Sequence, residues 1–100
     1  EEDERLRICF DTNHITADKP ENVIRELKNK IVTLHVSDFD FVDEKHWIPG
    51  DGEINWSEVV KALKDIKYNG VWMYEVGFQS RSGKLTVSDF KKNAEKILLA

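Results

Sequence analysis

Residues 31–36 read Ile-Val-Thr-Leu-His-Val, a short and almost wholly apolar run that is rich in β-branched side chains. Two similar runs flank it along the chain, Arg-Ile-Cys-Phe-Asp at residues 7–11 and Val-Trp-Met-Tyr-Glu-Val at residues 71–76. Each run is too short for a helix, and such runs are typical of strands buried on both faces of a parallel sheet. The sequence therefore predicts three strands.

A helical pattern follows each predicted strand. Pro20 suits the first turn of the first helix. Asn55 suits the N-cap of the second, with Glu58 three residues later as a capping-box partner. The third helix is predicted to begin near Thr86 or Ser88. The apolar stripes of the three helices are, in chain order, Val23, Ile24 and Leu27; then Val59, Val60, Leu63 and Ile66; then Phe90, Ala94, Ile97 and Leu98.

The order of these elements is β-α-β-α-β-α, which predicts an α/β fold with parallel strands and right-handed crossovers. The connections at residues 37–54 and 77–85 are long for loops that follow strands. Three such strands leave two sheet edges unpaired, and their helices would cover only one sheet face. We therefore expect either that further strands are missing or that another chain supplies them by self-association.

A polar side chain lies at or near the end of each predicted strand: Asp11 closes the first, and His35 and Glu75 lie near the ends of the second and third. Parallel strands place these ends side by side, and side chains alternate between the faces with period two. One face is therefore predicted to carry Arg7, Cys9 and Asp11; Ile31, Thr33 and His35; and Val71, Met73 and Glu75. The opposite face, under the helices, is predicted to carry Ile8 and Phe10; Val32 and Leu34; and Trp72 and Tyr74.

An aspartate, a histidine and a glutamate that converge would suit Mn²⁺, Mg²⁺, Co²⁺ or Zn²⁺. Each residue also has a structural interpretation. Asp11 alone is typical of a helix cap or turn, and His35 alone of a hydrogen-bonded core residue. Glu75 lies inside an apolar run, where an unpaired carboxylate is costly to bury. The coincidence of all three favours a metal site.

Two further histidines, His14 and His46, lie in predicted loops. Each alone is typical of an exposed loop residue. His46 shortly precedes Gly50-Asp51-Gly52, which could shape a tight turn or cradle a phosphate. The phosphate interpretation lacks the strand–turn–helix setting that gives glycine motifs their meaning.

The bulk composition narrows the classes of function. The net charge of −4 gives no general attraction to nucleic acid or to an anionic membrane. No apolar run of about 18 residues predicts a membrane span. A single cysteine, Cys9, excludes an intrachain disulfide and fits a cytoplasmic location. The chain opens on Glu1 without a methionine, and we expect an origin inside a longer protein or a processed product.

Four segments together resemble the xylose isomerase-like barrel superfamily, and within it the sugar phosphate isomerase/epimerase branch. The most specific segment is His-Trp-Ile-Pro-Gly-Asp-Gly-Glu-Ile-Asn-Trp at residues 46–56, which opens a predicted helix. The others are Phe-Asp-Thr-Asn-His at residues 10–14, Leu-His-Val-Ser-Asp at residues 34–38 and Tyr-Glu-Val at residues 74–76. The resemblance runs from about Ile8 to the C-terminus.

The resemblance implies a partial (β/α)₈ TIM barrel. Residues 1–100 would supply its C-terminal portion, the last three βα units, with the N-terminal part absent. In this family four successive strands hold a divalent metal through Glu, Asp, His and Glu. Asp11, His35 and Glu75 match the last three ligands, and the first Glu would precede residue 1. His14 and His46 match positions that contact the substrate.

The resemblance also implies a reaction, the isomerisation or epimerisation of a sugar or sugar phosphate by proton transfer through an enediolate. Glu75 would be both a metal ligand and one of two proton-transfer groups. Because the second carboxylate lies outside this chain, the chain alone is expected to be incomplete as a catalyst.

Two other functions stay open on the sequence. The same superfamily includes zinc-dependent apurinic-site endonucleases, and Glu44-Lys45-His46 nearly matches their Asp-x-His loop. The acidic net charge and the segment at residues 46–56 argue against nucleic acid as a partner. The chain could also be a non-catalytic barrel piece that associates with itself through its open sheet edges.

Overall fold

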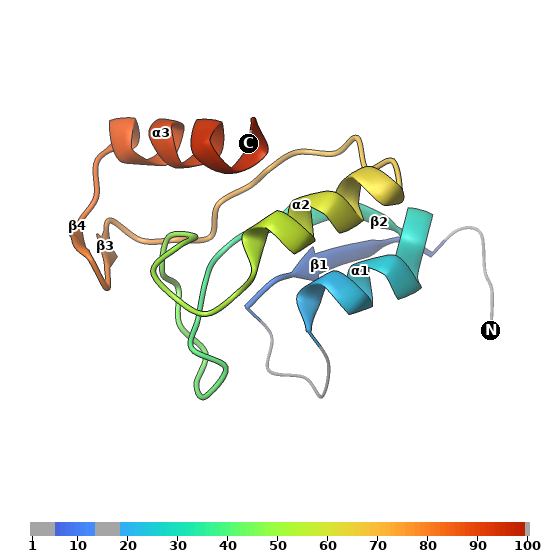
Figure 1. Ribbon diagram of the computed structural model, residues 1–100, viewed down its shortest axis with the longest axis horizontal. Coiled ribbons are helices and arrows are strands. Elements are labelled where there is room, and N and C mark those ends of the chain that lie inside the picture. Colours follow the sequence, from blue (N-terminus) through green and yellow to red (C-terminus); the bar gives the residue numbers. More distant parts are fainter. Residues whose placement is uncertain (1–5, 14–18, 100) are drawn as a thin grey trace.

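The computed structural model describes residues 6–13 and 19–99 of the chain. Strands and helices alternate in the first part of the chain, and a small β-hairpin followed by a helix forms the last part (Figure 1). The elements are, in order, β1 (Ile8–Asp11), α1 (Pro20–Leu27), the 3₁₀ helix η1 (Lys28–Lys30), β2 (Ile31–His35), α2 (Trp56–Asp65), β3 (Gln79–Ser80), β4 (Gly83–Lys84) and α3 (Val87–Leu98).

Strands β1 and β2 pair in parallel, as predicted, with Asp11 opposite His35 at their carboxyl ends. The predicted third strand is reduced to one parallel bridge, between Val36 and Tyr74. The backbone N–H of Val36 donates to Met73 O (2.7 Å), and that of Glu75 donates to Val36 O (2.9 Å). Among residues 6–13 and 19–99 no other strand pairs with the free edge of residues 71–76. These residues therefore have a hydrogen-bonded neighbour on one side alone, which explains why they do not form a longer strand.

The predicted assignment of β2 side chains to the two sheet faces is wrong at its start. Ile31, predicted on the open face, is 4% exposed, whereas Val32, predicted under the helices, is 47% exposed. The register passes from Ile8 opposite Ile31 to Cys9 opposite Thr33, so Val32 is an extra residue. Such a bulge interrupts the period-two alternation of the strand.

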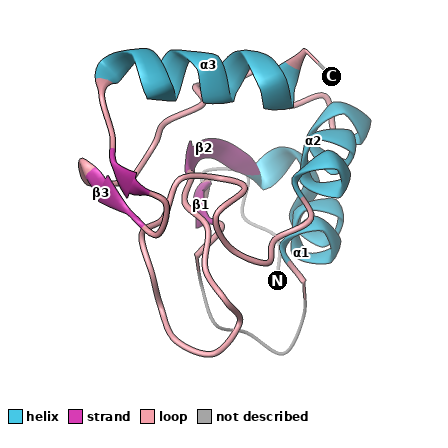
Figure 2. Cartoon of the chain, turned by 60° about the vertical axis from the view of Figure 1, so that its left-hand side comes forward, coloured by secondary structure: helices cyan, strands magenta, loops and turns pink. Residues whose placement is uncertain are grey.

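Helices α1 and α2 lie side by side over one face of the β1–β2 sheet (Figures 1 and 2). Arg25 of α1 joins Asp65 of α2 through an ion pair of 3.2 Å. The buried apolar side chains between these helices and the sheet form one cluster: Ile24, Ile31, Leu34, Val36, Phe39, Ile54, Trp56, Val59, Ala62 and Leu63. Burial of this apolar surface is the main stabilisation of the fold.

The opposite face of the sheet is open, as the sequence predicts. Val32, Val71 and Met73 are all exposed, and Val71 has 62% of its surface in solvent. Helix α3 does not cover this face, and none of its residues is fully buried. Large apolar side chains left in water at an unfinished sheet are typical of a surface that another element covers.

The helix ends follow the capping signals in the sequence. Pro20 is the first residue of α1. The Asn55 side chain caps α2 by accepting the N–H of Glu58. Of the two predicted starts of α3, the structure selects Thr86, which forms a reciprocal capping box with Asp89. Capping of this kind satisfies backbone donors that a helix leaves unpaired at its start.

The loop at residues 77–85 contains the β3–β4 hairpin, which the sequence did not predict. Gln79 pairs with Lys84 and Ser80 with Gly83, and Gly83 has a φ of +128°. Strands of two residues are too short to show an alternating pattern.

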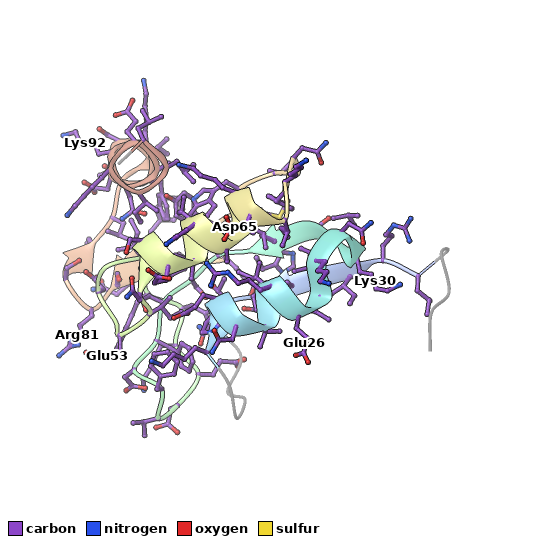
Figure 3. All side chains as sticks on the ribbon, turned by 45° about the vertical axis from the view of Figure 1, so that its right-hand side comes forward. Glu26, Lys30, Glu53, Asp65, Arg81 and Lys92 are labelled. Atoms are coloured by element: carbon purple, nitrogen blue, oxygen red, sulfur yellow. The ribbon has the colours of Figure 1, made fainter. Side chains whose placement is uncertain are left out.

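The side chains of Glu26, Arg81 and Lys92 point away from the body of the chain (Figure 3). None of the helices in the described part of the chain has the length and apolar character needed to cross a bilayer.

Candidate active site

Three strand-end side chains meet at the carboxyl edge of the sheet. Asp11 and His35 are the last residues of β1 and β2 and lie opposite each other in the register. Glu75 follows the bridge that joins Tyr74 to Val36. One donor atom from each of the three lies within 4.8 Å of the other two. The predicted convergence of Asp11, His35 and Glu75 is therefore confirmed as a matter of geometry.

Local contacts orient these three groups. The Nδ1 atom of His35 lies 3.2 Å from Oε2 of Glu75, and both side chains are partly exposed. The carboxylate of Asp11 accepts the backbone N–H of Asn13 at 2.8 Å, which fixes its direction at the end of β1. Two carboxylates and an imidazole at this spacing form a donor set that fits a divalent cation of the Mn²⁺, Mg²⁺, Co²⁺ or Zn²⁺ type.

His46 is brought to the same place from the long loop. Its Nδ1 atom lies 3.1 Å from the backbone oxygen of Glu75 and 3.8 Å from Oε1 of its carboxylate. The neighbouring Lys45 donates its backbone N–H to Oδ1 of Asn13 (3.2 Å). The loop thus joins the ends of two strand segments. The other predicted substrate contact, His14, lies outside the described residues.

A cleft of about 690 Å³ opens beside the three converging groups. It is a wide-open depression of the surface, and Asp11 and Glu75 are among the residues that line it. Three acidic residues line it, and among the residues the structure describes no lysine or arginine lines it. The lining residues are Asp11, Glu44, His46, Tyr74, Glu75, Val76 and Gly77. Acidic lining residues favour a cation over an anion at this place.

Asp38 holds the loop, and the sequence analysis did not single it out. Its side chain is fully buried. Five N–H groups donate to its carboxylate: Phe39 N and Ile54 N to Oδ1, and Gly50 N, Gly52 N and Trp56 Nε1 to Oδ2, at 2.8–3.1 Å. Two features of the sequence could have pointed to Asp38: it is an acidic residue directly after an apolar strand, and the Pro-Gly-Asp-Gly segment, which supplies backbone N–H groups, follows it.

The glycine segment at residues 50–52 is a turn, the first of the two interpretations that the sequence left open. Gly50 has a φ of +104°, which favours glycine. The N–H groups of Gly50 and Gly52 both donate to Asp38. They are therefore already used and do not form a phosphate cradle.

Asp51 ties the β3–β4 hairpin to the same loop. Its Oδ2 atom accepts hydrogen bonds from Ser80 Oγ (2.6 Å), Ser82 Oγ (2.7 Å) and the Ser82 backbone N–H (2.9 Å). The guanidinium of Arg81 lies 5.4 Å from the ring centroid of Trp47, a cation–π contact that adds a second link. The hairpin and the loop are therefore joined to each other by several contacts.

The Asp51 contacts predict a pH dependence of hairpin docking. Burial by itself raises the pKa of Asp51, but the donors of Ser80 and Ser82 outweigh it and bring the pKa below its ordinary value of 3.8. A lowered folded-state pKa stabilises the docked hairpin above that value, and this stabilisation is lost as pH falls through the folded pKa. We expect the Ser82 amide resonance to report a transition below pH 3.8. Asp51→Asn should remove the transition, and a midpoint above 3.8 would contradict the assignment.

Comparison with known proteins agrees with this architecture. Residues 1–95 match the model of the xylose isomerase-like TIM barrel family. The chain therefore belongs to the xylose isomerase-like TIM barrel family, and its fold is part of a (β/α)₈ barrel. A solved D-tagatose 3-epimerase-like protein superposes with a TM-score of 0.71 at 30% identity, over 96% of this chain and 34% of that one.

Two curated relatives match shorter stretches. An uncharacterised protein of Methanocaldococcus jannaschii is 39% identical over 70 residues, which are 66% of this chain and 24% of that protein. A D-psicose 3-epimerase of Enterocloster bolteae is 28% identical over 72 residues, which are 70% of this chain and 22% of that enzyme. The matched part of this chain thus spans about a quarter of each relative.

Proposed function

We propose that this chain carries part of the active site of a divalent-metal-dependent sugar isomerase or epimerase. The observation that supports this most is the convergence of Asp11, His35 and Glu75, with donor atoms within 4.8 Å of one another. They converge at the carboxyl edge of parallel barrel strands, where active sites of such barrels lie. The names of the similar proteins, a D-psicose 3-epimerase and a D-tagatose 3-epimerase-like protein, point to the same chemistry.

Asp11, His35 and Glu75 would hold the metal ion in this proposal. The histidine would bind as neutral imidazole and the two carboxylates in their charged forms, because metal ligands must be deprotonated. A bound divalent ion supplies positive charge that polarises the oxygens of a sugar and favours loss of a proton next to the carbonyl. The identity of the ion, among Mn²⁺, Mg²⁺, Co²⁺ and Zn²⁺, stays open.

Glu75 would also move the proton. Its carboxylate lies on the cleft wall, where it can take a proton from the sugar carbon beside the carbonyl, which leaves an enediolate. A second acid would donate its own proton to the neighbouring carbon or to the opposite face of the same carbon, and transfer of the proton on Glu75 to that group or to water would then reset the pair. His46, beside Glu75, would contact the sugar hydroxyls.

We propose that further strands complete the barrel and supply the second carboxylate. The open face with exposed Val32, Val71 and Met73 is the surface they would cover. They would come from a longer chain around residues 1–100 or from other copies of this one. A cytoplasmic location remains a prediction from the single cysteine, Cys9.

The assembled protein tests this proposal. We expect the protein with a completed barrel to epimerise ketoses at C3, with D-psicose and D-tagatose as the first substrates to test. Its activity should be lost when a chelator removes the metal. His35→Ala should weaken metal binding by about 10–100-fold or more, because loss of a ligand costs at least as much as loss of a group that orients one. Calorimetric titration with MnCl₂ measures this. Activity that survives chelation, or wild-type affinity in the variant, would refute the proposed site.

A further inference from the structure

Loop residues 39–54 lead from the end of the second strand segment to α2, and both limbs of this loop are held at Asp38. The backbone of Asp38 exchanges two hydrogen bonds with Trp47, from Asp38 N to Trp47 O (2.7 Å) and from Trp47 N to Asp38 O (3.2 Å). Its carboxylate takes the N–H groups of the returning limb at Gly50, Gly52 and Ile54. One residue therefore fixes the loop both at its middle and at its end.

His46 directly precedes Trp47, so its position depends on this anchorage. Its ring reaches the backbone oxygen of Glu75, 3.1 Å away. Ile48, two residues on, is held by a bond from its N–H to Ser80 Oγ (3.0 Å). Asp38 itself has no exposed surface and does not line the cleft. The carboxylate of Asp38 therefore acts on the cleft by way of the loop that carries His46.

We infer that Asp38 is a positioning residue, which holds His46 against Glu75 through the loop at residues 39–54. This role rests on the proposed function, since His46 matters there as a substrate contact. Five N–H donors leave the carboxylate fully used, so it is a structural acceptor and not a proton-transfer group. In this role Asp38 holds the imidazole of His46 at the position where it would contact the sugar.

The bonding pattern explains why a carboxylate is needed here. Oδ1 accepts two N–H groups and Oδ2 accepts three. An asparagine amide nitrogen carries its own hydrogens. In either orientation Asp38→Asn would set that nitrogen against two or three donors, and buried donors without an acceptor are destabilising. The returning limb should then loosen, and His46 should be held less firmly, because only the two backbone bonds between residue 38 and Trp47 would still fix this part of the loop.

Two variants and a matched control test the inference. Asp38→Asn replaces one acceptor oxygen by an NH₂ group, and Trp56→Phe removes the Nε1 donor together with part of the buried indole ring. Asp40→Asn makes the same chemical change in the same loop, where Asp40 binds only the exposed N–H groups of Val42 and Asp43. If Asp38→Asn does not fold, Trp56→Phe decides the question by the same measurements.

The first measurement does not depend on activity. At fixed pH, the ring ¹⁵N resonances of His46 should move toward those of a free imidazole in Asp38→Asn, move less in Trp56→Phe, and stay in place in Asp40→Asn. Unchanged His46 resonances in a folded Asp38→Asn protein would overturn the inference. This arm stays decisive if the assembled protein proves inactive on every ketose, a result that counts against the proposed function alone.

The second measurement is a double-mutant cycle on turnover. Asp38→Asn should lower kcat by about tenfold or more, because small displacements of positioned groups are costly. In a His46→Ala background the same change should lower kcat by less than about threefold, since residues that act through one another are not additive. Mn²⁺ affinity should stay within about threefold. An equal loss of kcat in both backgrounds would show that Asp38 acts by another route.

Discussion

Glu75→Gln in the assembled protein is expected to lower turnover by about 10²–10⁴-fold, the range that a positioned acid or base contributes. Glutamine keeps the shape of the side chain but cannot take a proton from carbon. It also replaces the charged oxygen that lies 3.2 Å from His35 Nδ1. Steady-state kinetics on a ketose measures the loss. Glu53→Gln, the same change at an exposed position, is the control and should leave turnover unchanged.

Two roles of Glu75 can be separated in that variant. If Glu75 is a metal ligand, Mn²⁺ affinity should fall together with kcat. If it is also the base, kcat should stay low when enough Mn²⁺ is added to refill the site. Recovery of turnover at high Mn²⁺ would leave Glu75 a ligand only. Unchanged turnover would remove it from the mechanism, and with it the strongest support for a sugar isomerase.

The convergence of Asp11, His35 and Glu75 could be predicted because it follows from two regular features. Parallel strands end at one edge, and side chains alternate along each strand. Both features act over a few residues and are visible in short apolar runs. The bridge at Val36 and Tyr74 was enough to preserve the geometry even though the third segment did not form a full strand.

The predictions failed or were missing where the structure depends on irregular features, which leave no repeating pattern of apolar residues in the sequence. The bulge at Val32 moved Ile31 into the core, and nothing in Ile-Val-Thr-Leu-His-Val marks which residue is extra. The bonds of Asp38 reach as far as Trp56, 18 positions along the chain. Their existence depends on a loop conformation that sequence spacing does not reveal. The sequence thus specified the metal-type donors better than the loop that surrounds them.

The same loop gives the largest expected effect on stability, at Gly52. A Cβ atom there would meet the backbone oxygen of Phe39 at a distance no carbon tolerates and would lie 2.6 Å from Oδ1 of Asp38. Neither atom can retreat, because the carboxylate accepts five N–H donors and the Phe39 oxygen accepts the N–H of Glu53 at 2.8 Å. Gly52→Ala should therefore reduce the free energy of unfolding by about 3 kcal/mol or more.

Two other glycines are matched controls for Gly52. An added Cβ would meet nothing within 4 Å at Gly50 or at Gly77. Gly50 has a φ of +104°, so Gly50→Ala should cost about 1–2 kcal/mol from backbone strain alone. Gly77 has no such φ, and Gly77→Ala should be neutral within about 0.5 kcal/mol. Chemical denaturation at one protein concentration measures all three.

The order of the three losses in free energy of unfolding tests why residue 52 must be glycine. If close approach of the backbone to Asp38 is what residue 52 requires, Gly52→Ala must cost more than Gly50→Ala, although only Gly50 has an unusual φ. The reverse order would mean that the loop gives way at little cost and that Asp38 does not hold it firmly. In that case the carboxylate would add little to the two backbone bonds between Asp38 and Trp47, and its proposed role in holding His46 beside Glu75 would fail as well.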